Sequence, residues 1–566
     1  MVTRKAITSG LGILRPNIAR TLKSRLCSKC WLRKESTISA SNTGKYFITT
    51  PIFYVNAQPH IGHLHSALLA DASYRFQLLK NKDNHIKTLF STGTDEHGLK
   101  IQQSAAKKGL PPIEFCNEIS EKFRRLFDAA NIGYTDYVRT VEERHVNAVR
   151  NFFQTIVDRG HIYKGAYSGW YCISDEAYLT DTQVKEVINS GAKQFISIES
   201  GHPVEWNSEE NYMFRLSDFQ DDLKYWLKSD DRVQPKRFLE ELRIWLEDDL
   251  RDLSVSRPKD RVSWGISVPN DENHNIYVWV DALVNYLTVA GYPNLSSWPP
   301  DVQVLGKDIL RFHGIYWPAL LMAAGLEPPK KLLCHSHWKI NDQKMSKSLG
   351  NIVCPFNCIE SYSSDGLRYF LLREGTAHSD NNWSDTRVVR LLNAELANSL
   401  GNLLNRCSAP SLNPNQEFPS LSLQYLNDIS PVGKQLIELI HTLPKEVENH
   451  YDNFNFYRAV DVIMAVVHSA NVFVQEEKPW ELKNMTDRSK LDSILRIALE
   501  TVRVVGIALL PVIPILASKL LDSIGVMKHN RYWEDIENVF SKENEKYLCN
   551  TYKLGSRTKF FSKLKV

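Results

Sequence analysis

Long apolar runs, paired cysteines and internal repeats are all missing from this sequence of 566 residues. No apolar stretch approaches the ~20 residues that cross a bilayer. The longest one, Val502–Leu516, is interrupted by Pro511 and Pro514 and is interpreted as a buried helix and its end. We therefore expect no membrane contact. The nine cysteines are scattered, which indicates free thiols in a reducing compartment.

Acidic residues are nearly absent from the first 40 positions, where Glu35 stands against nine basic residues. This Arg-, Ser- and Thr-rich, weakly amphipathic composition is typical of a mitochondrial transit peptide and not of a secretory signal. A disordered basic tail is the alternative, and a basic arm that binds nucleic acid is a weaker one. Because these residues more than account for the net charge of +4, any RNA binding by the remainder must rest on local basic patches.

The chain from Lys45 onward alternates strand and helix patterns, and its length predicts two to four domains. A strand over Lys45–Thr50 precedes a helix over Ile61–Leu79, then a strand over Ile86–Phe90 and a Gly-rich turn at Ser91–Gly98. This rhythm predicts a parallel α/β sheet.

Two regions depart from that rhythm. Residues of about 160–230 are rich in Tyr, Trp, Gly, Ser and Glu and predict an inserted, mostly β subdomain. The α/β pattern returns near Ile276–Val280 and Val302–Leu305, and from about residue 386 apolar-periodic stretches predict a separate helix bundle.

The motif Pro59-His60-Ile61-Gly62-His63 stands between the first expected strand and helix. A helix N-terminus offers free N–H groups and a positive dipole end to an anion. Two imidazoles add donors for phosphate oxygens, and Gly62 lets a nucleotide lie on the backbone. The alternative for so short a motif is a pair of helix-capping histidines.

A second motif, Lys344-Met-Ser-Lys-Ser348, follows about 280 residues later. A mobile loop with two lysines can close on a triphosphate and offset the charge that develops when the α-phosphate is attacked. An isolated charge run is ordinarily solvated surface. The order and spacing of the two motifs, each at an end of an α/β half, favour a shared nucleotide site.

Together these motifs resemble class I aminoacyl-tRNA synthetases, whose Rossmann-like domain holds ATP between them. Further segments resemble the methionyl-tRNA synthetase family: Thr49–Asn56, Thr92–Gly98, Glu210–Ser217, Asp252–Arg257, Val278–Ala282 and Gly306–His313. The resemblance runs from about residue 45 to the C-terminus. It implies an α/β fold, in which a class I Rossmann-like catalytic domain with an inserted connective subdomain precedes an all-α helix-bundle anticodon-binding domain.

The expected domain limits combine this resemblance with the composition. They are a transit peptide at 1–40, the first catalytic half at 41–160, the connective insert at 161–235, the second catalytic half at 236–345, the KMSKS loop and stem-contact region at 346–390, and the anticodon-binding domain at 391–566.

The resemblance implies a methionine–tRNA ligase. It would convert L-methionine and ATP to methionyl-adenylate and pyrophosphate, then transfer methionine to the 3′ end of tRNA(Met), with its CAU anticodon, in the mitochondrial matrix. No covalent enzyme nucleophile is expected, since catalysis rests on positioning and charge stabilisation. ATP is expected as its Mg²⁺ complex. A chain that ends soon after the bundle indicates a monomer.

The site residues implied by the resemblance fall into three groups. The expected ATP-binding residues are His60, Gly62, His63, Lys344, Ser346 and Lys347. The expected catalytic residues are His60, His63, Lys344, Lys347 and Arg257, with Lys347 stabilising the transition state and Arg257 contacting the adenylate region. The expected methionine-binding residues are Ile52, Tyr54, Asp95, Trp279, Ala282, Leu283, Tyr286, Ile309 and His313.

The expected methionine pocket agrees with the residue types. Trp279 and Tyr286 are seven apart, two turns along one helical face, and can wall an apolar slot. Aromatic rings suit a thioether, at ~0.3–1.5 kcal/mol per contact. By analogy with the family, Asp95 would accept bonds from the substrate ammonium, and His313 and Tyr54 would offer polar contacts near the sulfur. Ordinary core packing is the alternative for any one of these aromatics.

The sequence departs from the family pattern at two places. Ser336 stands where glycine is usual in Cys334-His-Ser-His-Trp338. Some family members carry zinc knuckles in the insert, but Cys172 has no CxxC partner there, and Cys27 and Cys30 stand alone near the N-terminus. Since a tetrahedral zinc site needs about four N or S ligands, we expect no zinc.

The helical region carries a polar stripe, because Asn398, Asn402 and Arg406 are spaced by four residues. With Trp480 they match the residues by which the family reads the anticodon, consistent with stacking and edge-bonding of splayed bases. For Asn398, a buried helix contact is the alternative.

Other functions are less consistent with the sequence. Class I synthetases for leucine, isoleucine or valine usually carry a large editing domain, and the insert of about 70 residues is too short for one. A cysteine enzyme would need a zinc site. An RNA-binding protein that has lost catalysis is the rival from another class, and a second RNA role stays open. A general nucleotidyltransferase would not explain the anticodon stripe.

Overall fold

The computed structural model describes most of the chain from Gly44 onward. The described residues are 44–83, 85–173, 177–179, 181–189, 192–198, 201–345, 351–541 and 544–565. The expected transit peptide, residues 1–40, lies outside them, and so do residues 346–348 of the motif Lys344–Ser348.

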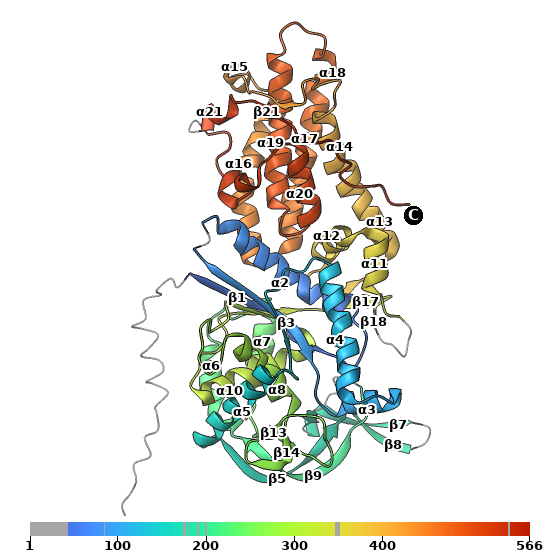
Figure 1. The fold of residues 1–566 in the computed structure, drawn as a ribbon, viewed down its shortest axis with the longest axis vertical. Helices are drawn as coiled ribbons and strands as arrows, with labels where there is room; N and C mark the ends of the chain where they lie inside the picture. The colour runs from blue at the N-terminus through green and yellow to red at the C-terminus, as the bar shows by residue number, and fades with distance from the viewer. Residues whose placement is uncertain are drawn as a thin grey trace, which may run out of the picture. The chain divides into compact units, whose positions relative to one another are not determined.

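A parallel sheet forms the centre of the first half, as the sequence predicted (Figure 1). Its strand order is β10 (Val233–Gln234), β16 (Leu332–His335), β15 (Val302–Gly306), β1 (Lys45–Thr49), β3 (Lys87–Asp95) and β2 (Phe53–Tyr54), with β4 (Asp136–Arg139) also on β3. Every described pairing in it is parallel. Most residues of these strands are buried, because helices cover the sheet.

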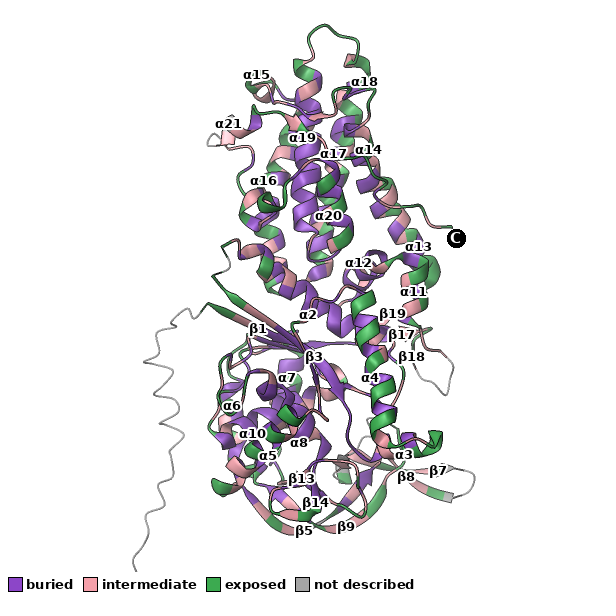
Figure 2. Cartoon of the chain, viewed as in Figure 1, coloured by how far each residue is buried: buried purple, intermediate pink, exposed green. Residues whose placement is uncertain are grey.

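Helices connect these strands where apolar residues recur at helical spacing. They are α2 (Ile61–Lys80), α3 (Leu99–Lys108), α4 (Pro112–Ala129), α5 (Glu143–Asp158), α6 (Gln220–Trp226), α7 (Lys236–Trp245), α8 (Val278–Leu283), α9 (Asn285–Val289) and α10 (Trp317–Ala324). In α4, Phe115, Ile119, Phe123 and Phe127 are buried on one face, with Pro112 at the first helical position. In contrast, α2 is buried nearly all round (Figure 2), because it packs on the sheet and on the bundle helices.

The inserted region is an antiparallel sheet with an attached hairpin. Its strands are β5 (Ile162–Cys172), β6 (Ala177–Leu179), β9 (Glu205–Phe214) and β11 (Leu253–Ser254), and the hairpin is β7 (Val184–Asn189) with β8 (Ala192–Ser197). A small sheet of β12 (Ser256–Pro258), β13 (Ser267–Val268) and β14 (Asp271–Ile276) follows. The central sheet already resumes at β10, inside the range expected for the insert.

One local prediction was wrong. Ser91–Asp95 continues β3 instead of forming a turn, because small residues let β4 approach closely: a Cβ on Gly93 would lie 1.9 Å from the Val138 carbonyl oxygen. The stretch Ile276–Val280, where the α/β pattern was expected to return, contains the end of β14 at Ile276 and the start of α8 at Val278.

The second half is helical, as predicted. Its elements are α11 (Pro355–Tyr362), α12 (Ser364–Glu374), α13 (Asp385–Leu392), η5 (Asn393–Leu400), α14 (Gly401–Cys407), α15 (Leu423–Asn427), α16 (Pro431–Asp452), α17 (Phe456–Glu477), α18 (Pro479–Leu482), α19 (Ser489–Ala508), α20 (Pro514–Ser523) and α21 (Glu545–Leu548), with β20 (Glu417–Phe418) paired to β21 (Tyr552–Lys553). The stretch Val502–Leu516 is the end of buried α19, a turn and the start of α20, as expected.

One described helix, α17, is long and apolar enough by length and composition to cross a membrane. It packs against α16 and α19, and its buried side chains include Val460, Ile463 and Val467. Burial within the bundle accounts for its hydropathy.

The two halves meet at a buried ion pair. Arg368 of α12 lies 2.6 Å from Asp71 of α2, and both side chains are fully buried. Asp71 also accepts the Gly133 N–H at 2.7 Å and the Arg75 Nε–H at 2.7 Å. Arg368 donates to the Val512 carbonyl at 3.0 Å, and further bonds go to the carbonyls of Pro511, Ala130 and Asn131. Every charge in this cluster is thus compensated.

We predict that Arg368→Met lowers the free energy of unfolding by ~3–5 kcal/mol, because it removes one of the two guanidinium partners of the buried Asp71 carboxylate and the donor to several buried carbonyls. Urea unfolding followed by circular dichroism measures this. Arg125→Gln, which breaks an exposed pair with Glu121, is the matched control and should change stability little. Equal effects of the two variants would contradict the importance of the junction.

Candidate active site

His60 and His63 form a stacked pair at the start of α2. His60 Nδ1 accepts the Gly62 N–H at 3.1 Å, and the His60 N–H donates to His63 Nδ1 at 3.3 Å. The ring centroids lie 3.7 Å apart. The histidines therefore do cap the helix, and since both Nδ1 atoms accept, both Nε2 atoms carry a proton. Capping thus places two imidazole N–H donors at the positive end of the helix dipole.

The ring pair depends on a glycine and on aromatic support. A Cβ on Gly62 would lie 2.9 Å from His60 Cε1, so the stacking requires glycine there. His63 packs edge-on against Phe53 of β2 at 5.3 Å and against Phe123 of α4 at 5.1 Å. The sheet and α4 together hold the donors in place.

A second cluster surrounds His313. The Tyr286 O–H donates to His313 Nε2 at 2.8 Å, and His313 Nδ1–H donates to the Ile309 carbonyl at 2.9 Å. Both side chains are buried, and burial lowers the pKa of His313 to about 4, against a weaker opposing effect of the bond to Ile309. The imidazole is therefore neutral near pH 7.

Trp279 adds an aromatic wall to this cluster. Its ring stacks on Phe312 at 3.8 Å and an interplanar angle of 13°, and it meets His313 edge-on at 6.4 Å. Phe312 begins a π-helical turn, Phe312–Tyr316. Phe312 was not among the pocket residues expected from the sequence, although it stands inside the segment Gly306–His313 and directly precedes His313.

The strand β2 joins the two clusters. Phe53 packs on His63, while Tyr54 packs against both large hydrophobic clusters, one of which includes Leu283 and Tyr286. Strand β2 thus lies where the two hydrophobic clusters meet. The remaining expected pocket residues lie in neighbouring segments. Asp95 of β3 stands opposite Tyr54 of β2 in the sheet, Ile52 is half-buried just before β2, and Ala282 is buried in α8.

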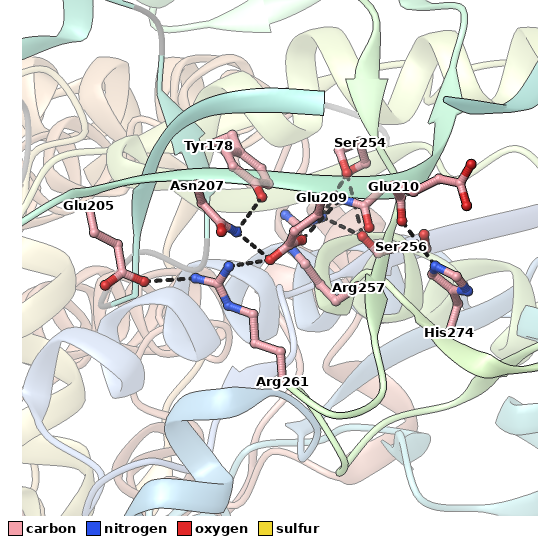
Figure 3. A network of polar contacts seen from close by, with 11 residues as sticks. Tyr178, Glu205, Asn207, Glu209, Glu210, Ser254, Ser256, Arg257, Arg261 and His274 are labelled. Carbon is pink, nitrogen blue, oxygen red and sulfur yellow. Dashed lines mark hydrogen bonds and ion pairs between the residues drawn. The ribbon is translucent and has the colours of Figure 1, made fainter. Parts of the chain in front are cut away.

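Arg257, in β12, lies in a box of three tyrosine rings, of which Figure 3 shows Tyr178. Its guanidinium carbon is 4.4 Å from the Tyr277 ring centroid, 4.8 Å from that of Tyr178 and 5.3 Å from that of Tyr171. It donates to the Ser256 carbonyl at 2.7 Å, and no ion pair joins it to a described carboxylate. A buried cation of this kind is costly until an anion compensates it.

Arg261 belongs to a network of polar contacts that links the inserted sheet to the tyrosine rings around Arg257. Arg261 pairs with Glu209 and, at 3.0 Å, with Glu205, and Asn207 bonds both Glu209 and the Tyr178 hydroxyl oxygen (Figure 3). Within the described part of the chain, no group of three or more His, Cys, Asp or Glu could hold a metal ion. Residues 174–176, 190–191 and 199–200 of the insert lie outside the described part.

The lysine motif begins on a hairpin, β17 (Trp338–Ile340) with β18 (Gln343–Lys344). Ser346 and Lys347 lie outside the described residues. Asp380 anchors the hairpin, because Lys339 and Lys307 each lie 2.7 Å from its carboxylate. Burial alone would raise the pKa of Asp380, but the bonds from Lys307 and Lys339 hold it well below its usual range.

Ser336, where glycine was usual, is fully buried before this hairpin. Its hydroxyl accepts from Arg237 at 2.7 Å and donates to the Ala377 carbonyl at 3.1 Å. The side chain is thus accommodated by two hydrogen bonds, and the local backbone forms without glycine.

The polar stripe lies on accessible helix surface. Asn398 is exposed in the π-helical segment η5, which excludes the buried-contact alternative. Asn402 and Arg406 are half-buried in α14, and Asn402 lies 3.5 Å from Asn471 of α17. Trp480 of α18 is 37% exposed. The contact with Asn471 was not expected from the sequence, because no sequence motif includes that residue.

Two family models together match most of the chain. The model for class I tRNA synthetases (M) matches residues 46–408, and that for the anticodon binding domain of methionyl tRNA ligase matches residues 427–547. The chain belongs to the methionyl-tRNA synthetase family. As a member it is a class I ligase that joins methionine to tRNA.

Individual relatives agree with this assignment. The human mitochondrial methionine–tRNA ligase is 49% identical, with 86% of this chain and 84% of the relative covered. The probable mitochondrial enzyme of Schizosaccharomyces pombe is 41% identical over 89% of this chain and 94% of its own length. The Mycobacterium tuberculosis methionyl-tRNA synthetase in complex with methionyl-adenylate has a TM-score of 0.84 and 33% identity, over 91% and 99% of the two chains.

We predict that Gly62→Ala lowers kcat/KM for ATP in this synthetase by about tenfold or more, because the new Cβ displaces the His60 ring from its cap. Steady-state ATP–pyrophosphate exchange measures the effect. Gly265→Ala is the matched control, since its new Cβ would lie no closer than 3.4 Å to Asn275, an ordinary van der Waals contact. An unchanged kcat/KM for ATP in Gly62→Ala would show that the stacked histidine pair contributes neither to ATP binding nor to its reaction.

Proposed function

We propose that this enzyme forms methionyl-adenylate from L-methionine and ATP at the carboxyl end of its parallel sheet and then charges a tRNA that bears the CAU anticodon. The observation that supports the proposal is the position of strand β2. Phe53 supports the imidazole donors at the start of α2, and Tyr54 packs against the large hydrophobic cluster that includes Leu283 and Tyr286. Two substrates bound there would meet beside one strand.

Methionine would insert its thioether between Trp279, Tyr286 and the neutral His313. Aromatic faces and edges contact sulfur favourably. The residues Ile52, Ala282, Leu283 and Ile309 would add apolar walls. Asp95, at the end of β3, would accept the substrate ammonium, and this places the carboxylate of methionine toward ATP.

ATP would bind on the N-terminus of α2, where His60, Gly62 and His63 supply donors and a close backbone. Lys344, Ser346 and Lys347 would close on the triphosphate, and Lys347 would stabilise charge on the departing pyrophosphate. Arg257, a buried cation without a described carboxylate partner, would be compensated by the anionic adenylate.

Mg²⁺ would enter with ATP. The donors placed at the start of α2 are imidazole and backbone N–H groups, which suit phosphate oxygens and not a hard cation. The ion would therefore be held chiefly by ATP phosphates and water, as Mg²⁺ commonly is, where it would neutralise part of the triphosphate charge.

The tRNA anticodon would bind on α14, η5 and α18. Asn398, Asn402 and Arg406 offer amide and guanidinium groups for base edges, and exposed Trp480 offers a stacking surface. The 1–40 segment would direct the chain to the mitochondrial matrix, where the mature enzyme would act as a monomer with the domain limits expected from its sequence.

We predict that protein lacking residues 1–40 catalyses ATP–pyrophosphate exchange with methionine alone among the twenty amino acids. Lys347→Ala should retain the fold by circular dichroism and lose at least about 100-fold in kcat, a loss typical of removing a transition-state contact.

Other outcomes of the exchange assay and of Lys347→Ala would contradict the proposal in different ways. Exchange with a different amino acid would reassign the pocket. No exchange by folded protein with magnesium present would favour an RNA-binding protein without catalysis. Full activity of Lys347→Ala would remove that lysine from the transition state.

We predict that Trp480→Ala lowers kcat/KM for tRNA charging by roughly 5- to 150-fold, equivalent to the ~1–3 kcal/mol of one stacked base, while exchange without tRNA is unchanged. Met485→Ala, also exposed near α18, is the matched control. Equal loss of both activities in Trp480→Ala would contradict the anticodon assignment.

A further inference from the structure

A buried carboxylate, Asp281, joins three segments around the proposed methionine pocket. It lies in α8, with Oδ2 2.7 Å from His97 Nδ1 and Oδ1 2.7 Å from His145 Nε2. The side chains of Asp281, His97 and His145 are 1%, 7% and 0% exposed. His97 belongs to the loop after β3, and His145 to the first turn of α5.

The contacts continue beyond the two histidines. His145 Nδ1 lies 2.9 Å from Thr288 Oγ1 in α9, and this hydroxyl donates to the Val284 carbonyl at 3.1 Å. His97 packs on Trp264, whose Nε1–H donates to the Glu96 carbonyl at 2.6 Å. A connected set of polar contacts therefore runs from the end of β3 through α8 to α5 and α9.

Three members of this set stand within two residues of a residue of the proposed pocket. His97 is two residues after Asp95, the proposed ammonium acceptor. Asp281 stands between Trp279 and Ala282 in α8, and Thr288 is two residues after Tyr286. The contacts thus fix the distance between the segment that would bind the ammonium and the helices that would bind the thioether.

The carboxylate is suited to this task because it can accept from both sides at once. Burial alone would raise the pKa of Asp281, but the neighbouring His97 and the hydrogen bond from His145 hold it below its ordinary value. Desolvating such a group is costly, and a purely structural contact between these helices could be made by apolar side chains. Buried polar networks, when fully satisfied, fix one arrangement of the elements they join.

We propose that Asp281 is a positioning residue for methionine: by bonding His97 and His145 it holds the Asp95 segment at a set distance from the Trp279 and Tyr286 walls. Asp281 itself does not touch the substrate. The inference rests on the proposed assignment of Asp95, Trp279 and Tyr286 to the methionine pocket.

Asp281→Asn tests the proposal, because the amide has the same size but removes the negative charge and one of the two oxygens that accept from the histidines. In ATP–pyrophosphate exchange with the full chain, we expect the KM for methionine to rise by about tenfold or more, while the KM for ATP stays within about twofold. Asp365→Asn is the matched control: it alters another buried carboxylate, which accepts the Leu516 N–H at 2.6 Å at the contact with α20. This control should leave the KM for methionine unchanged.

Further variants separate the possible failures. His97→Gln removes one of the two contacts and should raise the KM for methionine as well; the double variant with Asp281→Asn should show less than the product of the two effects. His97→Gln also carries the test if Asp281→Asn does not fold. A parallel rise in both KM values, or a methionine effect of equal size in Asp365→Asn, would overturn the proposal and leave a structural role only.

Trp279→Ala distinguishes this inference from the pocket assignment. If Trp279→Ala raises the KM for methionine but Asp281→Asn does not, the positioning role fails while the pocket stands. If neither variant changes it, the pocket assignment fails, and the positioning role fails with it.

Discussion

The buried contact between Asp71 and Arg368 is the constraint on which the arrangement of the molecule depends. Asp71 lies in α2, the helix whose first turn holds the stacked histidines, and Arg368 lies in α12, which packs against the helical bundle. Arg368 also bonds the carbonyls of Pro511 and Val512, between α19 and α20. One guanidinium therefore ties the helix that carries the stacked histidines to the bundle core, and desolvation makes an unpaired alternative arrangement costly.

The segment that follows Arg368 connects this junction to two functional regions. Asp380 holds the β17–β18 hairpin that leads into the lysine motif, through Lys307 and Lys339. The chain then continues into α13, η5 and α14, which carry the polar stripe of the anticodon face. One stretch of about 45 residues thus contributes Arg368 to the junction, Asp380 to the anchor of the hairpin and the polar stripe to the proposed RNA surface. Rigid helices and short loops allow it to fix their spacing.

The sequence predicted what local patterns encode. The capping histidines with Gly62, the helix after them, the parallel sheet and the bundle all follow from motifs, period and resemblance. It missed what depends on contacts distant in sequence. Ser91–Asp95 looks like a turn until Val138 approaches Gly93 in the folded sheet. Phe312 became part of the aromatic wall only through its stacking on Trp279, and Asp281 meets a histidine 184 positions away. No periodicity records such pairs.

The proposed methionine pocket would exclude polar and charged side chains, because its buried imidazole, His313, offers them no free hydrogen-bond partner. Both nitrogens of His313 are already bonded, to Tyr286 and Ile309, and its imidazole is neutral. A charged or strongly polar side chain in this cluster would lose its hydration without gaining a partner, which costs several kcal/mol. An aliphatic side chain would pay no such penalty, and shape alone discriminates it by only ~1–3 kcal/mol per methylene. The stacked rings of Trp279 and Phe312 then favour a thioether over a methylene, because sulfur is more polarisable.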